Sequence, residues 1–291
     1  MDADLTAAPV RAGAASTGSD RLVRTSGSTA LAEAAAQVLR DNDTGSITVA
    51  APSLYPHQWS WDTAFITVGL AHLSVPRAIA EMSALLAAQW RTGMIPHIVF
   101  SEADGYFPGP ERWRTELSPS RPAGPPTSGI CQPPVHSLAL AAIVSTARRR
   151  SAADRRAAEE FLRTTFDRWL MWHDWLANVR DPDGTGLVAI HHSWESGMDN
   201  SPRWDAPYSR VAVGAIEPFA RRDTAHVEDV AERPTDDDYR RYIWLVDQMA
   251  AARYDDAVLA RTLDFRVADV FTSALLALAS DVLAELADDI A

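Results

Sequence analysis

The sequence contains one cysteine among 291 residues, Cys131, so an internal disulfide is excluded. A chain without disulfides suits a reducing cytoplasm, and we expect Cys131 to be a small, partly buried residue without a reactive role. Apolar runs are interrupted before they reach the ~18 residues that a membrane-spanning helix needs. We therefore expect a cytoplasmic location and no membrane partner.

The sequence also lacks the patterns of several ligand classes. The net charge is -12, and no basic stripe exists beyond residues 148–150, which we expect to close a helix C-terminus. This balance argues against nucleic acid as a partner. No glycine-rich phosphate loop or nucleophile elbow is present, which excludes kinase, dinucleotide-binding and serine-hydrolase functions.

Metal-binding spacing is missing as well. Histidines that could serve as metal ligands are His57, His97, His136, His191 and His192. They form neither a His-x-x-x-His pattern on a helix nor a cluster with cysteine. We expect structural histidines, no metal and no cofactor.

What is present is the composition of a globular protein, with 47% hydrophobic and 23% charged residues. Residues 1–27 are rich in alanine, serine, threonine, glycine and aspartate. They lack the apolar segment of a signal peptide, and we expect a disordered extension. The pattern of a folded domain begins at Ser28 and continues to the end of the chain.

Helical periodicity dominates this domain. Helices are predicted over residues 29–40, 62–70, 76–92, 134–150, 152–179, 236–253 and 267–289. Ser28 and Asp62 stand where N-caps of two of these helices would lie. Residues 101–132 contain too many prolines and glycines for long elements. Paired helices joined by short turns and long polar loops predict an all-α fold of stacked helical hairpins.

One polar loop, residues 194–205 (WESGMDNSPRWD), has the character of a site. It contains three acids, two tryptophans and an arginine, while Gly197 and Pro202 prevent a regular helix. The ordering of such a loop is more easily explained by a ligand than by core packing. Residues 186–192 read as a short extended run that brings the loop to the surface.

This loop, together with residues 55–62 (YPHQWSWD), resembles glycoside hydrolase family sixty-three. The likeness is strongest to bacterial members that hydrolyse glucosylglycerate and mannosylglycerate, and it extends from about Ala30 to the C-terminus. It implies an (α/α)6 barrel with the active site where the long loops converge, and a small-molecule glycoside as partner. The chain has fewer predicted helices than six hairpins need and stops in a helical pattern. We therefore expect residues 28–291 to be a partial catalytic domain whose last helix exposes an apolar flank.

Cleavage of a glycosidic bond requires two carboxyl groups, one of them protonated near neutral pH. The resemblance places the general acid at Asp199, if its neighbours desolvate it. The alternative is an aspartate that caps the loop beside Asn200 and Ser201. In the family the general base is a glutamate near the C-terminus, which we expect beyond Ala291. Glu195 and Asp205 are expected to hydrogen-bond the loop.

Sugar binding combines hydrogen bonds with flat rings against the pyranose. Aromatic residues in loop-like surroundings, the candidates for this platform, are Tyr55, Trp59, Trp61 and Trp194. Tryptophans at core spacing on a helix are Trp169, Trp172 and Trp175. By resemblance the pocket is also lined by Asp62, Tyr106, Gln132 and Gly197. Ordinary structural roles stay open: an N-cap for Asp62, and loop contacts for the tyrosine and glutamine.

The glycerate half of the substrate would need a planar cation, and arginine holds a carboxylate through two parallel hydrogen bonds. By resemblance Arg233 is this clamp and Tyr239 donates a hydroxyl group. Alternatively Arg233 pairs with the acids at 236–238 on the surface, which would favour a trehalase-like or oligosaccharide-trimming α-glucosidase.

The leading hypothesis is an inverting hydrolase of glucosylglycerate or mannosylglycerate. A sugar- or glycerate-binding remnant without turnover is the alternative from another class. Association into a homo-oligomer stays open.

Overall fold

The structure, a computed structural model, describes residues 26–102 and 106–290; the predicted extension over 1–27 lies almost wholly outside them. Its helices are α1 (Ser26–Asp41), α2 (Ser60–Leu73), α3 (Val75–Ala87), α4 (Pro110–Trp113), α5 (His136–Arg150), α6 (Ala152–Asp174), α7 (Asp205–Tyr208), α8 (Asp236–Ala251), α9 (Asp256–Thr262) and α10 (Val270–Asp288). Its strands are β1 (Gln58–Trp59), β2 (Ile98–Val99), β3 (Ala189–Ile190) and β4 (Val267–Ala268). These form two antiparallel pairs, β1 with β2 and β3 with β4. The all-α prediction is confirmed.

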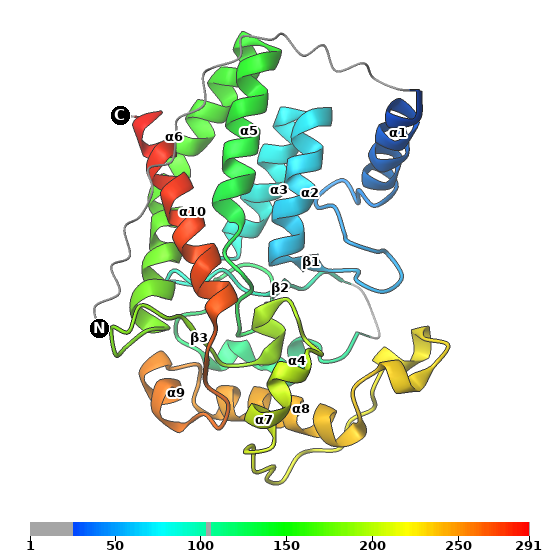
Figure 1. The fold of residues 1–291 in the computed structure, drawn as a ribbon, viewed down its shortest axis with the longest axis vertical. Helices are drawn as coiled ribbons and strands as arrows, with labels where there is room; N and C mark the ends of the chain where they lie inside the picture. The colour runs from blue at the N-terminus through cyan, green and yellow to red at the C-terminus, as the bar shows by residue number, and fades with distance from the viewer. Residues whose placement is uncertain (1–25, 103–105, 291) are drawn as a thin grey trace, which may run out of the picture. The chain divides into compact units, whose positions relative to one another are not determined.

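The long helices α2, α3, α5, α6 and α10 pack against one another (Figure 1). Helix α5 contacts α2, α6 and α10, so its apolar side chains are covered on several sides. Leu140 and Ile143 on α5 are almost completely buried. The tryptophans predicted for the core, Trp169, Trp172 and Trp175, are 1%, 0% and 2% exposed.

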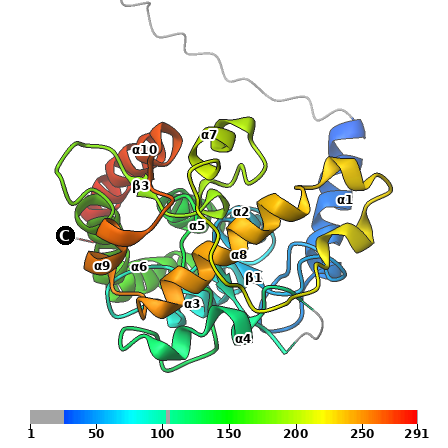
Figure 2. The same cartoon turned by 90° about the horizontal axis from the view of Figure 1, so that it is seen from below.

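The helices α4, α7, α8 and α9 lie at one end of these long helices (Figure 1), and α8 extends across that end (Figure 2). Helix α8 begins with a capping box, in which Thr235 and Asp238 satisfy each other's backbone N–H groups. Tyr239 and Tyr242 on this helix are buried and face the loops of the candidate site. The sequence pattern therefore places two aromatic hydroxyl groups on a well-capped helix.

Several predicted boundaries are wrong. Helix α1 begins at Ser26, so Ser28 lies inside it. Helix α2 begins at Ser60 with Trp59 as its N-cap residue, so Asp62 lies in the first turn and is not the cap. Helix α10 begins only at Val270, because Asp269 caps it by accepting a hydrogen bond from the Thr272 N–H at 2.8 Å. The preceding residues pair with β3 instead.

Helix α10 is long and apolar enough to span a membrane by length and composition, which the sequence expectation had denied. It packs against α5 and α6, and Leu283 and Leu286 are buried. Among the described residues these contacts cover only part of the helix, since 28% of its most apolar 18-residue stretch is buried. Val270 and Leu278, expected on an apolar flank, are 70% and 49% exposed.

Candidate active site

The acid-bearing loop is irregular, as its glycine and proline predict. Two 3-10 turns, Ser193–Ser196 and Pro202–Trp204, flank a left-handed Gly197 with φ of 69°. The Ser196 hydroxyl donates to the Ser193 carbonyl at 2.6 Å and accepts from the Met198 N–H at 3.0 Å. The Trp204 indole donates to the Met198 carbonyl at 2.8 Å. These bonds fix the backbone just before Asp199.

The start of the loop is anchored inside the fold, whereas Asp199 and Asn200 in its middle are exposed, so the expectation that the approach leads to the surface holds only for the middle of the loop. The carboxylate of Glu195 is 0% exposed and accepts two 2.7 Å hydrogen bonds from the Arg180 guanidinium. It also accepts from the backbone N–H groups of His191 at 2.6 Å and Cys131 at 3.1 Å. Burial opposes ionisation of Glu195, but the charge and hydrogen bonds of Arg180 outweigh the effect of burial and lower the pKa of Glu195. The predicted hydrogen-bonding role of Glu195 is confirmed.

Asp205 and Cys131 can also be placed. Asp205 is the first residue of α7, and its backbone carbonyl accepts from the Ser209 N–H at 2.9 Å. Cys131 is 2% exposed, more deeply buried than expected, and its thiol contacts Glu195 at 3.4 Å. Burial raises the pKa of this thiol, so the residue is neutral and unreactive.

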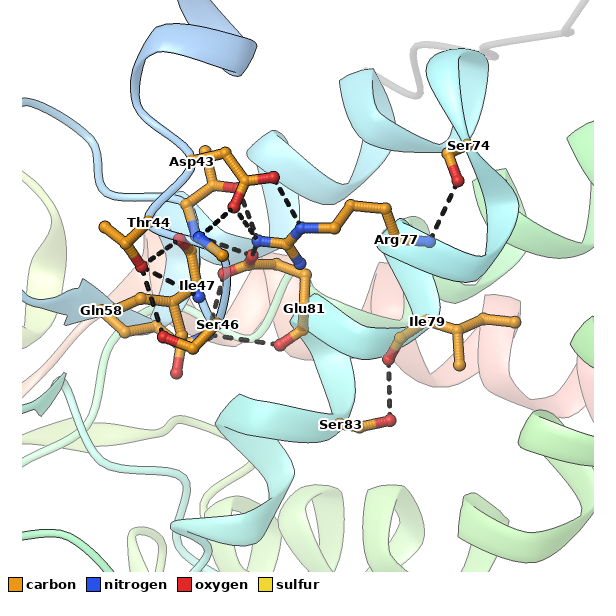
Figure 3. Close-up of polar contacts among 12 residues, drawn as sticks. Asp43, Thr44, Ser46, Ile47, Gln58, Ser74, Arg77, Ile79, Glu81 and Ser83 are labelled. Atoms are coloured by element: carbon orange, nitrogen blue, oxygen red, sulfur yellow. Dashed lines mark hydrogen bonds and ion pairs between the residues drawn. The ribbon is translucent and has the colours of Figure 1, made fainter.

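The motif at residues 55–62 is anchored by a second buried carboxylate (Figure 3). Glu81 on α3 is 0% exposed and accepts a 2.9 Å hydrogen bond from the side-chain amide of Gln58 on β1. It also pairs with Arg77 at 2.8 Å, and Arg77 in turn pairs with Asp43 at 2.9 Å. Because Gln58 immediately precedes Trp59, this network fixes the strand that presents the tryptophan.

The two motifs meet at Gly197. A side chain at this position would collide with the ring of Trp61, so only glycine allows the approach. The Trp61 N–H donates to the side-chain carbonyl of Gln132 at 3.1 Å. Trp61 therefore packs against the loop and Gln132 holds the Trp61 backbone, and neither residue is among those that line the cavity.

The cavity beside this loop has a volume of about 850 Å³. The predicted site residues that line it are Tyr55, Trp59, Tyr106, Trp194, Gly197, Asp199, Arg233 and Tyr239. They come from segments far apart in the sequence. Asp62 does not line the cavity, although its charge acts on Asp199. The structure thus brings together most of the predicted set, while Trp61, Asp62 and Gln132 are not among the lining residues.

Asp199 has the protonation behaviour that a general acid needs. Its side chain is accessible from the cavity but surrounded by protein, and this desolvation raises its pKa to about 6. The positive charge of Arg233 opposes the shift, whereas the nearby charge of Asp62 adds to it. A carboxyl group in this state holds its proton close to neutral pH.

Aromatic rings line the same cavity and form its aromatic wall. Trp59 meets Tyr55 edge-on at 5.2 Å and Tyr106 edge-on at 5.6 Å, measured between ring centroids. His97, which no sequence pattern distinguishes from the other histidines, also lines the cavity and stacks on Trp194 at 6.5 Å. Burial lowers the pKa of His97 to about 3, so its ring is neutral.

The other histidines are structural, as predicted. His57, His136, His191 and His192 are each at most 2% exposed. Within residues 26–102 and 106–290, no three histidine, cysteine or acidic side chains are grouped so that they could hold a metal ion.

Part of the lining, the basic end, carries the arginines Arg222 and Arg233. Arg233 pairs with Asp223 at 3.3 Å, and among the described residues it makes no ion pair with the adjacent acids at 236–238. Asp223 and Arg222 line the cavity as well, and Tyr239 lies beside them with its hydroxyl 3.5 Å from the Phe107 carbonyl. The sequence did not predict Asp223 or Arg222 because no local pattern marks them.

A larger cavity of about 1200 Å³ adjoins the first and shares Tyr106, Phe107 and Arg222 with it. Its Asp247 pairs with Arg112 and lies 3.6 Å from Arg114. Asp199, the carboxyl group that titrates near neutral pH, faces the smaller cavity. The smaller cavity is therefore the candidate site.

Residues 55–290 match the model of the mannosylglycerate hydrolase MGH1-like glycoside hydrolase domain. The chain belongs to this family. It is 51% identical over 263 residues to the glucosylglycerate hydrolase of Mycolicibacterium hassiacum, covering 90% of this chain and 59% of that protein. It is 43% identical to the mannosylglycerate hydrolase MGH1 of Selaginella moellendorffii, and this match covers 88% of this chain and 50% of that protein.

Solved structures agree with the family. The mannosylglycerate hydrolase of Thermus thermophilus, from glycoside hydrolase family sixty-three, superposes with a TM-score of 0.81 at 41% identity in its complex with Tris. The complex of the same protein with Tris and D-glycerate superposes with a TM-score of 0.80 at 42% identity. Both cover 89% of this chain and 60% of the solved chain. The expected helical-barrel fold is confirmed, and the chain spans about three fifths of the Mycolicibacterium and Thermus proteins.

Proposed function

We propose that this chain carries the acid-bearing part of an inverting glycosidase that cleaves glucosylglycerate or mannosylglycerate. The observation that carries the proposal is the cavity itself, in which a carboxyl group with a pKa of about 6 shares the lining with an aromatic wall and a basic end. In this proposal Asp199 protonates the glycosidic oxygen as the bond to the sugar breaks.

Two parts of the lining suit the two halves of such a substrate. The rings of Trp59, Tyr106 and Trp194 offer apolar faces for a pyranose. At the basic end Arg233 uses its Nε–H for Asp223, and within the described part of the chain no partner is found for its two terminal nitrogens. These two NH2 groups can donate two parallel hydrogen bonds to one carboxylate.

The proposal places the general base outside residues 1–291. Of the described acids, those that line the cavity are Asp199 and Asp223, and the second is bonded to two arginines. An inverting enzyme needs a carboxylate about 6.5–9.5 Å from the acid, with room for water between them. A glutamate from the part of the longer relatives that this chain does not span would supply it.

A binding function without turnover is the second candidate, because the cavity carries one unpaired acid among the described residues. The two candidates separate in a hydrolysis screen of glucosylglycerate, mannosylglycerate, trehalose and kojibiose. The screen compares residues 1–291 with a family-length protein, meaning these residues continued to the length of their relatives. Hydrolysis of a glycerate substrate by the longer protein alone is expected; cleavage of trehalose or kojibiose instead would overturn the substrate assignment.

Arg233→Ala is expected to weaken the affinity for D-glycerate and for glucosylglycerate. A hydrogen bond to a charged group contributes about 1.5–3 kcal/mol, which corresponds to about 10–150-fold in the dissociation constant. The partial exposure of Arg233, 30% for its side chain, favours the lower end. Calorimetric titration measures the effect, with glucose as neutral ligand and Arg240→Ala, an exposed arginine of α8, as the matched control. Equal affinities for glycerate in wild type and Arg233→Ala would remove Arg233 from the site.

The pH dependence of kcat/KM follows from the raised pKa of Asp199. The acid acts only when protonated, so kcat/KM is expected to fall about tenfold per unit above about pH 6. On the acidic side the profile is limited by the general base, which must be ionised. The profile is measured in the family-length protein at constant ionic strength. A rate that stays constant from pH 6 to pH 8 would contradict the assignment of Asp199 as the acid.

A further inference from the structure

Asp223 occupies an unusual place in the basic end of the cavity. Its carboxylate accepts from the Arg221 Nε–H at 3.0 Å and from the Arg221 terminal nitrogen at 2.7 Å. The same carboxylate accepts from the Arg233 Nε–H at 3.3 Å. One acid thus joins two arginines, and the side chains of Asp223 and Arg221 are each 11% exposed.

Arg221 lies outside helix α8 but its side chain is held against that helix by two contacts. Its remaining terminal nitrogen donates to Asp236 at 2.8 Å, in the first turn of that helix. Its guanidinium carbon lies 4.7 Å from the centre of the Tyr239 ring. A continuous series of contacts therefore runs from α8 through Arg221 and Asp223 to Arg233.

Arg233 has little other support among the described residues. It lies outside regular structure, between the 3-10 turn Val230–Glu232 and α8, and its own backbone N–H bonds to the Val230 carbonyl at 3.0 Å. An arginine side chain has about 2 kcal/mol of rotamer entropy to lose on being fixed. The bond to Asp223 uses Nε, and among the described residues neither terminal nitrogen of Arg233 has a hydrogen-bond partner.

We propose that Asp223 is the positioning residue for the carboxylate clamp, and that it selects glycosides with an anionic aglycone by orienting Arg233 toward the cavity. This inference rests on the proposed function of Arg233. In this role Asp223, although it lines the cavity, acts through the arginine and not on the reacting atoms. This arrangement places the negative charge of Asp223 beside the position proposed for the ligand carboxylate. The positive charges of Arg221 and Arg233 offset the repulsion between the two.

The direction in which one substitution changes the affinity for D-glycerate distinguishes a positioning role from a simple electrostatic effect. Asp223→Asn removes a negative charge, so by Coulomb's law alone it should strengthen the binding of an anionic ligand. If Asp223 positions Arg233, the same substitution should weaken D-glycerate binding about tenfold, the size of coupling usual between residues in contact. Glucose, which carries no charge, should bind unchanged, and Asp223→Glu should recover part of the loss.

The chain offers a matched control. Asp247 also lies between two arginines, with its side chain 17% exposed, but it lines the adjoining cavity. Asp247→Asn is expected to leave glycerate and glucose binding unchanged. In an Arg233→Ala background, Asp223→Asn should cause no further loss, because the group that it positions is gone.

The outcomes are distinct for the two proposals. If Arg233→Ala leaves glycerate binding unchanged, the proposed function fails. If Arg233→Ala weakens binding but Asp223→Asn leaves it equal or tighter, the positioning role alone is overturned. Unfolding of Asp223→Asn is detected by circular dichroism and by lost glucose binding. In that case the smaller Asp223→Ser decides by the same measurement, and glycerate binding as tight as in wild type would overturn the role.

Discussion

Replacing Asp199 with asparagine is expected to lower the turnover of glucosylglycerate by the family-length protein about 10²–10⁴-fold, the usual contribution of a general acid. Asparagine has nearly the shape of aspartic acid but no acidic proton to give to the glycosidic oxygen. The affinity for the substrate should change little, because the aromatic wall and the basic end of the cavity are untouched. Steady-state kinetics separate the two effects as a loss in kcat with KM retained.

A second substrate makes this test specific. A glucosyl fluoride has a leaving group that departs without protonation, so its hydrolysis by Asp199→Asn should fall far less than that of glucosylglycerate. Asp205→Asn, in the same loop but at the start of α7, is the matched control and should keep wild-type turnover. Activity of Asp199→Asn within tenfold of wild type on glucosylglycerate would show that another group supplies the proton.

Glu195→Ala is expected to destabilise the protein by about 3–5 kcal/mol, because it leaves the Arg180 guanidinium buried without its counter-charge. That loss is a large part of the roughly 5–15 kcal/mol that usually separates folded from unfolded protein. The free energy of unfolding in urea measures it. The double replacement Arg180→Met with Glu195→Leu should lose much less, since no unpaired charge remains. A single replacement that costs under about 1 kcal/mol would show that the pair is not buried.

The same pair predicts the direction of the pH effect on stability. The pKa of Glu195 is lower in the folded protein than its ordinary value of 4.5, so the folded state favours the ionised form. The stabilisation is therefore present above pH 4.5 and is lost as the pH falls below it. Glu195→Gln should show a shallower loss of stability in this acidic range than wild type.

The helices could be predicted from sequence where apolar residues repeat over many turns, as in α5, α6 and α8. The irregular loop around Asp199 could be predicted because Gly197 and Pro202 exclude helix locally. The start of α10 could not, because the pairing of Val267–Ala268 with β3 depends on a distant segment. The local sequence pattern thus predicts helices and irregular loops well, but it predicts pairing between distant strands poorly.

The candidate site follows the same rule. Asp199 and Arg233 lie in recognisable motifs, and the structure places both on one cavity. Asp223 and His97 lie in no motif, and they reach the cavity only through contacts that form on folding. Gln132 was assigned to the sugar pocket but supports Trp61, a difference of one layer that no sequence pattern encodes.

The contact between Gly197 and Trp61 has a consequence for folding kinetics. It joins segments from opposite halves of the described chain, so the chain must close a long loop before the acid can face the aromatic wall. Contacts of such high sequence separation slow folding and form late. During synthesis the aromatic motif leaves the ribosome well before the loop that completes the cavity. The site therefore has no competent precursor: until the two motifs meet, the emerging chain exposes tryptophans that a chaperone could bind and a substrate could not.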